Sequence, residues 1–225
     1  YRIVYIPYET EIADTDNAKQ AHFNESVIQN CWRQYTLYET MKKDYFKYCT
    51  NATAVRAIGL PKFDALYEPE KFPLPDEIRQ LSNGRKIILW KVHFPKVISE
   101  NGKKILVTPY IEEYVSFAKK IQQYGNLFFI FMPHPRFQEF NDDIQVKRKL
   151  ELLIHILQKA DNVYIDNQDD YRYSLCNADS IIIDRSAVMV EAGSRNIPIL
   201  YMYNPDFNEP LTEAIAPLIE SYYQG

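Results

Sequence analysis

Glycine is scarce in this sequence, with only 6 residues in 225. The glycine-rich loops GxGxxG and GxxxxGK[ST], which hold dinucleotides and nucleoside triphosphates, do not occur. The GxSxG turn of serine esterases and the HExxH pair of zinc hydrolases are missing too. These absences weigh against hydride transfer, P-loop chemistry, esterase chemistry and zinc hydrolysis.

Cysteine and long apolar runs are also rare. The cysteines Cys31, Cys49 and Cys176 are far apart and odd in number, which favours free thiols in a reducing compartment and predicts no metal site. The longest apolar run, from Leu127 to Met132, is much shorter than the roughly 20 residues of a membrane span. We therefore expect a cytoplasmic domain. The sequence begins at Tyr1, and we interpret it as part of a longer protein. Peripheral association with the inner face of the membrane, through segments outside this chain, therefore stays open.

Excess positive charge is absent as well. The net charge is -4 and the isoelectric point is about 5.7, so no overall basic field is available to attract nucleic acid. A local cluster of basic side chains remains compatible with phosphate binding. The sequence therefore predicts no nucleic-acid partner.

Apolar runs alternate with helical patterns in the second part of the chain. Bounded apolar runs predict buried strands, and the intervening segments show helix start and stop signals such as Asp142 or Asp143 before a helix and Gly125 after one. The predicted strands are Lys86–Val92, Asn126–Met132, Asn162–Asp166, Ser180–Asp184 and Ile197–Tyr203. The predicted helices span residues 109–124, 143–159, 169–176 and 186–195. This alternation predicts an α/β fold, a Rossmann-like parallel sheet with helices on both faces.

The first part of the chain is less regular. Residues 2–8 are predicted to form a strand, and residues 25–49 lack proline and glycine and carry a wide apolar face, which predicts one helix. Three prolines between Tyr67 and Pro75 indicate a connection. We expect residues 1–56 to be the end of an N-terminal domain with a connecting helix, and residues 57–225 to form a second domain.

Functional residues of a parallel sheet are expected directly after its strands. His134 and Arg136 follow the strand that ends at Met132, and prolines on both sides of His134 restrict the backbone. Arginine can pair with phosphate oxygens in bidentate fashion, and histidine can donate a hydrogen bond or act as an acid. The pair is a candidate anion site, although a proline-rich surface turn would also explain it. His93, after the strand that ends at Val92, is a weaker candidate.

A second group follows the strand that ends at Asp184. Ser186 is expected to cap the next helix, whose free N–H groups would suit a diphosphate. Glu191, farther along that helix, is expected to face the same cleft. Asp184 and Ser186 can equally be a strand terminus and an ordinary helix cap.

A third group lies at a turn that begins with Gly59. Lys62 is a candidate contact for phosphate there, and Asp64 is a candidate for positioning the loop. Taken alone, such a segment is more often a structural turn than a ligand site.

In this order, the groups resemble the CDP-glycerol glycerophosphotransferase family, bacterial enzymes that build teichoic-acid-like and capsular polymers. The resemblance covers about residues 50–205. Its matching segments are Gly59–Asp64, Lys86–Trp90, His134–Pro135, Ala178–Glu191 and Asn196–Tyr201.

The resemblance implies the C-terminal, donor-binding half of a GT-B fold. It also implies transfer of glycerol phosphate, or a related polyol phosphate, from a CDP-activated donor to a hydroxyl on a polymer or lipid-linked acceptor. His134 would be catalytic, and the residues expected at the donor phosphates are Arg136, Asp184, Arg185, Ser186, Ala187, Glu191, Gly59 and Lys62. No cofactor is required by this scheme, although Mg²⁺ on the diphosphate is compatible with it.

Two departures from the family pattern matter. Ala187 stands where the family has a second serine, so one hydroxyl is lost from the phosphate loop. The Trp-His-Gly motif of the family's N-terminal domain has no match here. If that histidine is the catalytic base, this chain alone should bind donor without turning it over.

Two other interpretations stay open. The same sheet logic fits a GT-B glycosyltransferase or sugar-nucleotide enzyme that uses a UDP- or GDP-sugar, with Glu191 binding a ribose or sugar hydroxyl. A non-catalytic module is the third interpretation, in which the tyrosine-rich segment 25–49 packs against another domain or subunit.

Overall fold

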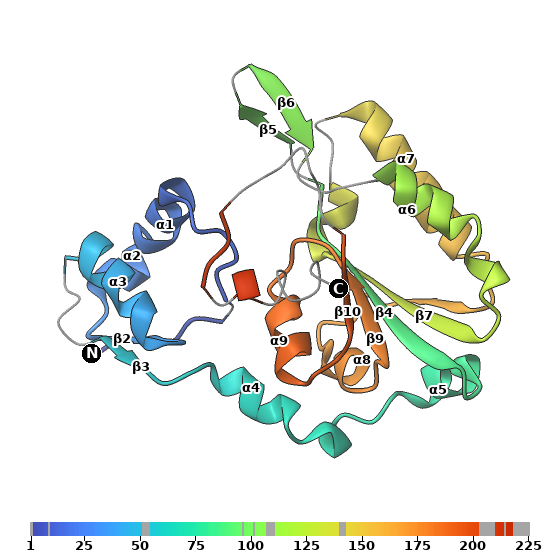
Figure 1. Cartoon of the computed structure of the whole chain (residues 1–225), viewed down its shortest axis with the longest axis horizontal. Helices are drawn as coiled ribbons and strands as arrows, with labels where there is room; N and C mark the ends of the chain where they lie inside the picture. Colours follow the sequence, from blue (N-terminus) through green and yellow to red (C-terminus); the bar gives the residue numbers. More distant parts are fainter. Residues whose placement is uncertain are drawn as a thin grey trace. The chain divides into compact units, whose positions relative to one another are not determined.

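The computed structural model describes residues 2–8, 10–50, 55–95, 97–100, 102–106, 111–139, 143–202, 210–213 and 215–217. The chain forms two compact units, here called unit 1 (residues 1–67 and 209–225) and unit 2 (residues 68–208) (Figure 1). The division falls at the start of the segment with three prolines, later than the expected boundary after residue 56. The return of the chain to unit 1 was not expected, and it rests on backbone pairing of residues 210–212 with residues 11–14.

Unit 2 is built on a parallel sheet of five strands, in the order β10-β9-β4-β7-β8. The strands are β4 (Lys86–Val92), β7 (Leu127–Pro133), β8 (Val163–Ile165), β9 (Ser180–Ile183) and β10 (Ile199–Tyr201). Four of them begin and end within one residue of the predicted bounds. Strand β10 begins two residues later than predicted, and its predicted end at Tyr203 lies outside the described residues. Strand β4 is central, and the chain winds first to β7 and β8 and then across to β9 and β10. This reversal of direction creates a switch point beside β4, the place where such sheets bind ligands.

Helices cover both faces of this sheet (Figure 1). One face carries α6 (Ile111–Ala118) and α7 (Ile144–Leu157), and the other carries α5 (Asp76–Ser82), α8 (Arg172–Cys176) and α9 (Val188–Ser194). Asp143 caps α7 as predicted, because its carboxylate accepts the N–H groups of Gln145 and Val146 at 2.8 and 3.1 Å. Short 3₁₀ turns occur at Pro69–Lys71, Ile121–Gln123 and Pro135–Glu139.

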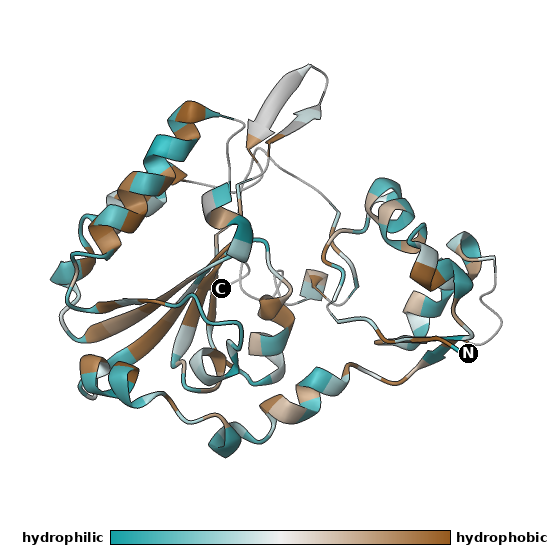
Figure 2. Cartoon of the chain, turned by 180° about the vertical axis from the view of Figure 1, so that it is seen from behind, coloured by the Kyte–Doolittle hydropathy of each residue, from teal (hydrophilic) through white to brown (hydrophobic). Residues whose placement is uncertain are grey.

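The core between the sheet and helices α6 and α7 is aromatic. Trp90 of β4 is 1% exposed and meets Tyr114, Phe117 and Phe131 edge to face at 5.1–5.4 Å between ring centroids. Such pairs contribute about 0.5–1.5 kcal/mol each beyond the burial of their area. The apolar strands show as brown ribbons in Figure 2. This packing holds the last residues of β4 against α6, and these residues lead directly into the candidate site.

Two features of unit 2 differ from the sequence expectations. Helix α9 begins at Val188 with Ala187 in the capping position, so the prediction that Ser186 is the cap was wrong by one residue. The Ser186 hydroxyl still accepts the Val188 N–H, at a long 3.4 Å. An unpredicted antiparallel hairpin joins β5 (Val97–Glu100) and β6 (Lys103–Leu106), with Gly102 at φ 75° in its turn.

Unit 1 contains a parallel sheet of three strands in the order β1-β2-β3. The strands are β1 (Val4–Tyr5), β2 (Arg33–Thr36) and β3 (Val55–Ala57). Its helices are α1 (Asp16–Phe23), α2 (Ser26–Asn30), α3 (Lys42–Tyr48) and α4 (Pro61–Leu66), with a 3₁₀ turn at Glu39–Met41. A small core of Phe23, Ile28, Tyr45, Cys49 and Val55 packs between the helices and the sheet. None of the described helices is long and apolar enough to cross a membrane.

The single helix predicted for residues 25–49 was wrong. The segment forms α2, the strand β2, a 3₁₀ turn and α3. Helix α2 ends because Cys31 adopts an extended conformation at ψ 150°, and β2 then buries Gln34 and Thr36 on alternate positions. Gln34 is kept in the core by donating its side-chain N–H to the carbonyl of Ile28 at 3.0 Å. The apolar residues of several short elements are therefore spaced in the sequence like those on one face of a long helix.

Candidate functional site

The candidate site lies at the carboxyl ends of three neighbouring strands of unit 2. His93 follows β4, His134 follows β7 and Asp184 follows β9, and β4 runs between the other two strands. The backbone N–H of His134 donates to the carbonyl of Val92 at 2.8 Å, which continues the pairing of β7 with β4. The strand order thus brings together residues that are about 40 to 90 positions apart in the sequence.

Asp184 ties this edge of the sheet together. Its side chain is completely buried, and its two oxygens accept the backbone N–H of His93 at 2.8 Å and the hydroxyl of Tyr114 at 3.1 Å. Burial raises the pKa of Asp184 to about 7, against the opposing effect of these donors and of Lys91. Asp184 therefore positions the loop after β4 and is enclosed by protein on all sides.

His134 is held by its neighbours in one orientation. Its Nδ1 accepts the backbone N–H of Arg136 at 3.1 Å, and its carbonyl accepts the N–H of Phe137 at 2.8 Å. Burial lowers the pKa of His134, and the charges of Lys91 and Arg136 lower it further against the opposing effect of Glu139, which favours the neutral imidazole at pH 7. A neutral ring whose Nδ1 accepts a hydrogen bond carries its proton on Nε2. His134 is therefore a hydrogen-bond donor through Nε2.

Phe94 lies at the centre of a stack of rings at this edge. The ring of His93 stacks on it at 4.2 Å between centroids, and the ring of His134 lies 4.8 Å away. The guanidinium of Arg136 lies over the same phenyl ring at 4.8 Å from its centroid, and it is also 3.4 Å from the carboxylate of Glu139. The two imidazoles are 5.3 Å apart. Phe94 thus links both histidines and Arg136 in one assembly.

Positive charge accumulates beneath and around these rings. Lys91, near the end of β4, is only 8% exposed, and burial lowers its pKa to about 8 although Asp184 and Asp166 counteract the decrease. Burial, together with His134, Lys91 and Arg185, lowers the pKa of His93 to about 4, although its bond to the Phe94 carbonyl opposes the decrease. An anion bound at this edge would relieve the repulsion that these groups exert on one another.

The remaining predicted residues are placed differently. Glu191 is 2% exposed and accepts the hydroxyl of Tyr171 at 2.8 Å, so its carboxylate is engaged inside unit 2. Arg185 and Ser186 are half-buried just after Asp184. Gly59, at φ 77°, and Lys62, on the first turn of α4, belong to unit 1.

The sequence reasoning missed Lys91 and undervalued His93. Lys91 is an interior charge within the apolar strand Lys86–Val92, a signal that was present in the sequence. His93 was ranked below His134, yet both rings contact Phe94. Tyr114, which binds Asp184, gave no signal because its partner is 70 residues away.

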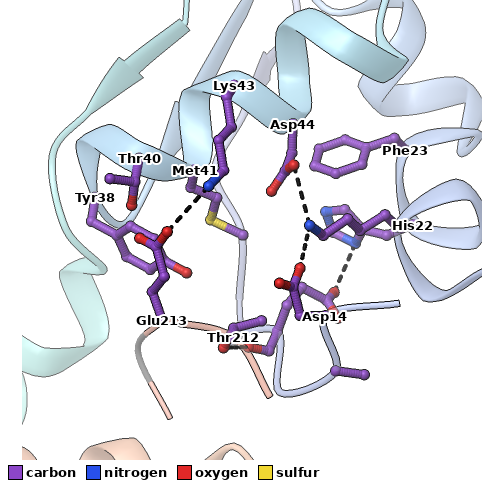
Figure 3. A pocket seen from close by; sticks show the side chains of 13 residues that line it. Asp14, His22, Phe23, Tyr38, Thr40, Met41, Lys43, Asp44, Thr212 and Glu213 are labelled. Atoms are coloured by element: carbon purple, nitrogen blue, oxygen red, sulfur yellow. Dashed lines mark hydrogen bonds and ion pairs between the residues drawn. The ribbon is translucent and has the colours of Figure 1, made fainter. Parts of the chain in front are cut away.

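A pocket within unit 1 has a different character (Figure 3). Its volume is about 30 Å³, and the ammonium of Lys19 lies between the carboxylates of Asp14 and Asp44. The pairs His22–Glu11 and Lys43–Glu213 complete its charged lining, at 3.0 and 3.1 Å. Carboxylates outnumber ammonium groups around this pocket, whereas Lys91, Arg136 and Arg185 bring positive charge to the edge of the unit 2 sheet. The edge is therefore the better candidate for an anionic ligand.

No metal-binding group stands out in the part of the chain that the structure describes, where no three His, Cys, Asp or Glu side chains are grouped to hold an ion. The chemical capacity of the edge therefore rests on its imidazoles and cations. They are suited to bind phosphate oxygens and to stabilise negative charge that develops on them.

The amino-acid sequence matches no protein-family model and no curated protein. Among solved structures, UDP-GlcNAc 2-epimerase from Neisseria meningitidis bound to UDP-GlcNAc has a TM-score of 0.55 at 17% identity, covering 99% of this chain and 61% of that chain. The wall teichoic acid polymerase TagF has a TM-score of 0.55 at 12% identity, with coverages of 89% and 48%. A co-structure of S. aureus MnaA with UDP has a TM-score of 0.54 at 16% identity, with coverages of 87% and 48%.

The chain spans between 48% and 61% of the length of these three neighbours. At such low identity the likeness concerns the fold, and it agrees with the parallel sheet and its helices on both faces. The predicted fold class is confirmed: the chain has the Rossmann-like α/β architecture of the GT-B class.

Proposed function

We propose that this chain is the donor-binding part of an enzyme that transfers glycerol phosphate, or a related polyol phosphate, from a CDP-activated donor. The acceptor would be a hydroxyl on a polymer or lipid-linked molecule in the synthesis of teichoic-acid-like or capsular polymers. The observation that carries the proposal is the edge at the switch point, where the cations Arg136 and Lys91 and the hydrogen-bond donor His134 gather at the carboxyl ends of β4 and β7. The motifs from Gly59 to Tyr201 that resemble the CDP-glycerol family supply the choice of donor.

In the proposed reaction, the acceptor oxygen attacks the phosphorus that bears glycerol, and CMP leaves. Phosphoryl transfer depends mainly on positioning and on electrostatic stabilisation of the transferring group. His134 would donate a hydrogen bond from Nε2 to a phosphate oxygen. Arg136 would leave its ion pair with Glu139 and bind the phosphate instead. Lys91 would supply positive charge from below without direct exposure to solvent.

A second candidate function is supported by the structural neighbours. UDP-GlcNAc 2-epimerase and the MnaA–UDP co-structure resemble the chain as closely as TagF does, with TM-scores of 0.55 and 0.54 against 0.55. The same edge would then bind the diphosphate of a UDP-sugar, in a sugar-nucleotide enzyme or a glycosyltransferase. The replacement of a family serine by Ala187 fits a donor different from CDP-glycerol.

Calorimetric titration of the chain with CDP-glycerol, CDP, CMP, UDP and GDP, each with and without Mg²⁺, separates these functions. We expect cytidine-selective binding that tolerates removal of Mg²⁺, because side-chain cations already face the diphosphate. His134→Ala should weaken CDP binding by about 10- to 100-fold, the effect of losing one hydrogen bond to a charged group.

His155→Ala is the matched control, since His155 is an exposed histidine on α7. It should leave CDP affinity unchanged. Selective binding of UDP would favour the second candidate. Equal affinities of the His134→Ala variant and the unchanged chain for every nucleotide would contradict both functions at this site.

A further inference from the structure

The two neighbouring imidazoles of the site are held in opposite tautomers. We infer that His93 presents a lone pair on Nε2 and accepts the proton of the attacking hydroxyl, while His134 presents a proton to the donor phosphate. This inference rests on the proposed function and adds the residue that removes the acceptor proton. It assigns that step to unit 2 of this chain, which has no match to the Trp-His-Gly motif.

The tautomer of His93 follows from its partner. Its Nδ1 lies 2.8 Å from the carbonyl oxygen of Phe94. A carbonyl oxygen only accepts hydrogen bonds, so Nδ1 must carry a proton. In the neutral ring the lone pair is then on Nε2, and that nitrogen is able to accept a proton.

The tautomer of His134 follows from the opposite relation. Its Nδ1 is 3.1 Å from a backbone N–H, that of Arg136, and an N–H only donates. The proton of the neutral His134 ring is therefore on Nε2. With 5.3 Å between the ring centroids, a proton donor and a proton acceptor lie side by side at the end of two paired strands.

The orientation of His93 is fixed on several sides. Its backbone N–H is bound by the buried carboxylate of Asp184 at 2.8 Å, and its ring stacks on Phe94 with 30° between the planes. A ring restrained in this way keeps its lone pair in one direction, which general base catalysis requires.

The surrounding charges link the basicity of His93 to donor binding. Burial is the main cause of the low pKa of His93, about 4; the Phe94 carbonyl opposes it, and His134, Lys91 and Arg185 lower the pKa as well. The carboxylate of Asp184 is turned to the backbone N–H of His93. A bound diphosphate would neutralise the cations and raise the pKa of His93. The base would therefore become effective when donor is in place.

The reaction step balances as follows. The acceptor oxygen forms a bond to the phosphorus that bears glycerol, and the bridging P–O bond to CMP breaks with its electron pair going to CMP. The proton of the acceptor hydroxyl moves to Nε2 of His93. The imidazolium formed there returns this proton to solvent after CMP leaves.

The test combines nitrogen NMR of histidine-labelled chain with a His93→Gln variant of the protein. Long-range ¹H–¹⁵N spectra should show the proton on Nδ1 of His93 and on Nε2 of His134, and saturation with CDP should raise the apparent pKa of His93. In His93→Gln, CDP affinity should stay within about threefold, CMP release should fall by about 100-fold or more, and the acidic limb of the pH profile should disappear.

The outcomes separate the inference from the proposed function. If the unaltered chain bound none of the nucleotides, the proposed function itself would be contradicted. Normal CDP binding with both histidines in the same tautomer would overturn the inference, as would unchanged CMP release and an unchanged pH profile in His93→Gln.

Discussion

Replacement of Lys91 by methionine is expected to raise the free energy of unfolding at pH 7 by about 3 kcal/mol and to weaken nucleotide binding by at least about tenfold. Lys91 is 8% exposed, and burial lowers the pKa of its ammonium from 10.5 to about 8, so its charge opposes folding. Methionine has a similar length and no charge, and therefore removes this cost. The same charge is proposed to face the donor diphosphate, which makes the residue costly for folding and useful for binding.

Lys86→Met is the matched control, because Lys86 begins the strand that Lys91 nearly ends. Its side chain is 72% exposed and pairs with Asp179 at 2.7 Å, an exposed ion pair that contributes about 0–1 kcal/mol. Chemical denaturation should show little change for Lys86→Met, and calorimetry with CDP should show none. A Lys91→Met variant that is less stable, or that binds CDP as before, would contradict the role given to this charge.

The Asp184→Asn variant should gain stability relative to the unaltered chain as the pH rises from about 4 to about 8. Asp184 has a pKa of about 7 in the folded chain against a reference value of 3.8. Well below pH 3.8 the carboxyl is protonated in both states and contributes no difference. Between these values the folded state retains a proton that the unfolded state has released, so stability falls as the pH rises. The full difference is about 4 kcal/mol, and asparagine removes it.

His93 has the opposite effect on the pH dependence of stability. Its pKa is lowered from 6.5 to about 4, chiefly by burial, so it contributes stability that rises with pH over this window. In the unaltered chain the two effects largely cancel, and Asp184→Asn should reveal the rising profile. Denaturant unfolding at several pH values measures it.

Asp179→Asn provides the control with the reverse sign. Asp179 precedes β9 and accepts the N–H of Ile87 at 2.8 Å. Burial raises its pKa, but the bonds from Lys86 and Ile87 outweigh burial and the net pKa is lowered. Relative to the unaltered chain, Asp179→Asn should lose stability as the pH rises through the acidic range. If Asp184→Asn behaved in the same way as Asp179→Asn, Asp184 would be an ordinary charged partner.

The strands of unit 2 could be predicted because parallel strands that are buried on both faces form continuous apolar runs. The run Lys86–Val92 and the run ending at Met132 are such cases, and both appear as paired strands. The hairpin of β5 and β6 could have been found from Asn101-Gly102, a common turn pair between strands. The separate elements of segment 25–49 could not be predicted, because the apolar residues of several short elements follow one helical period.

The site was predictable in part for a related reason. His134 and Asp184 were found because each follows a strand directly, and strand ends were visible in the sequence. The neighbours of each residue depend on strand order, which apolar runs do not encode. The order β9-β4-β7 places His93 between them and makes it a full member of the site. Lys91 was not predicted as a site residue, because a single charged residue in an apolar strand usually indicates an exposed position.

Crystals of the chain grown with CDP, and in parallel with UDP, test the central claim most directly. The account predicts that the diphosphate of the bound nucleotide lies at the carboxyl end of β4 and β7, within hydrogen-bond distance of Nε2 of His134 and close to Arg136. A diphosphate bound instead in the pocket of unit 1, beside Lys19 and Lys43, would contradict it.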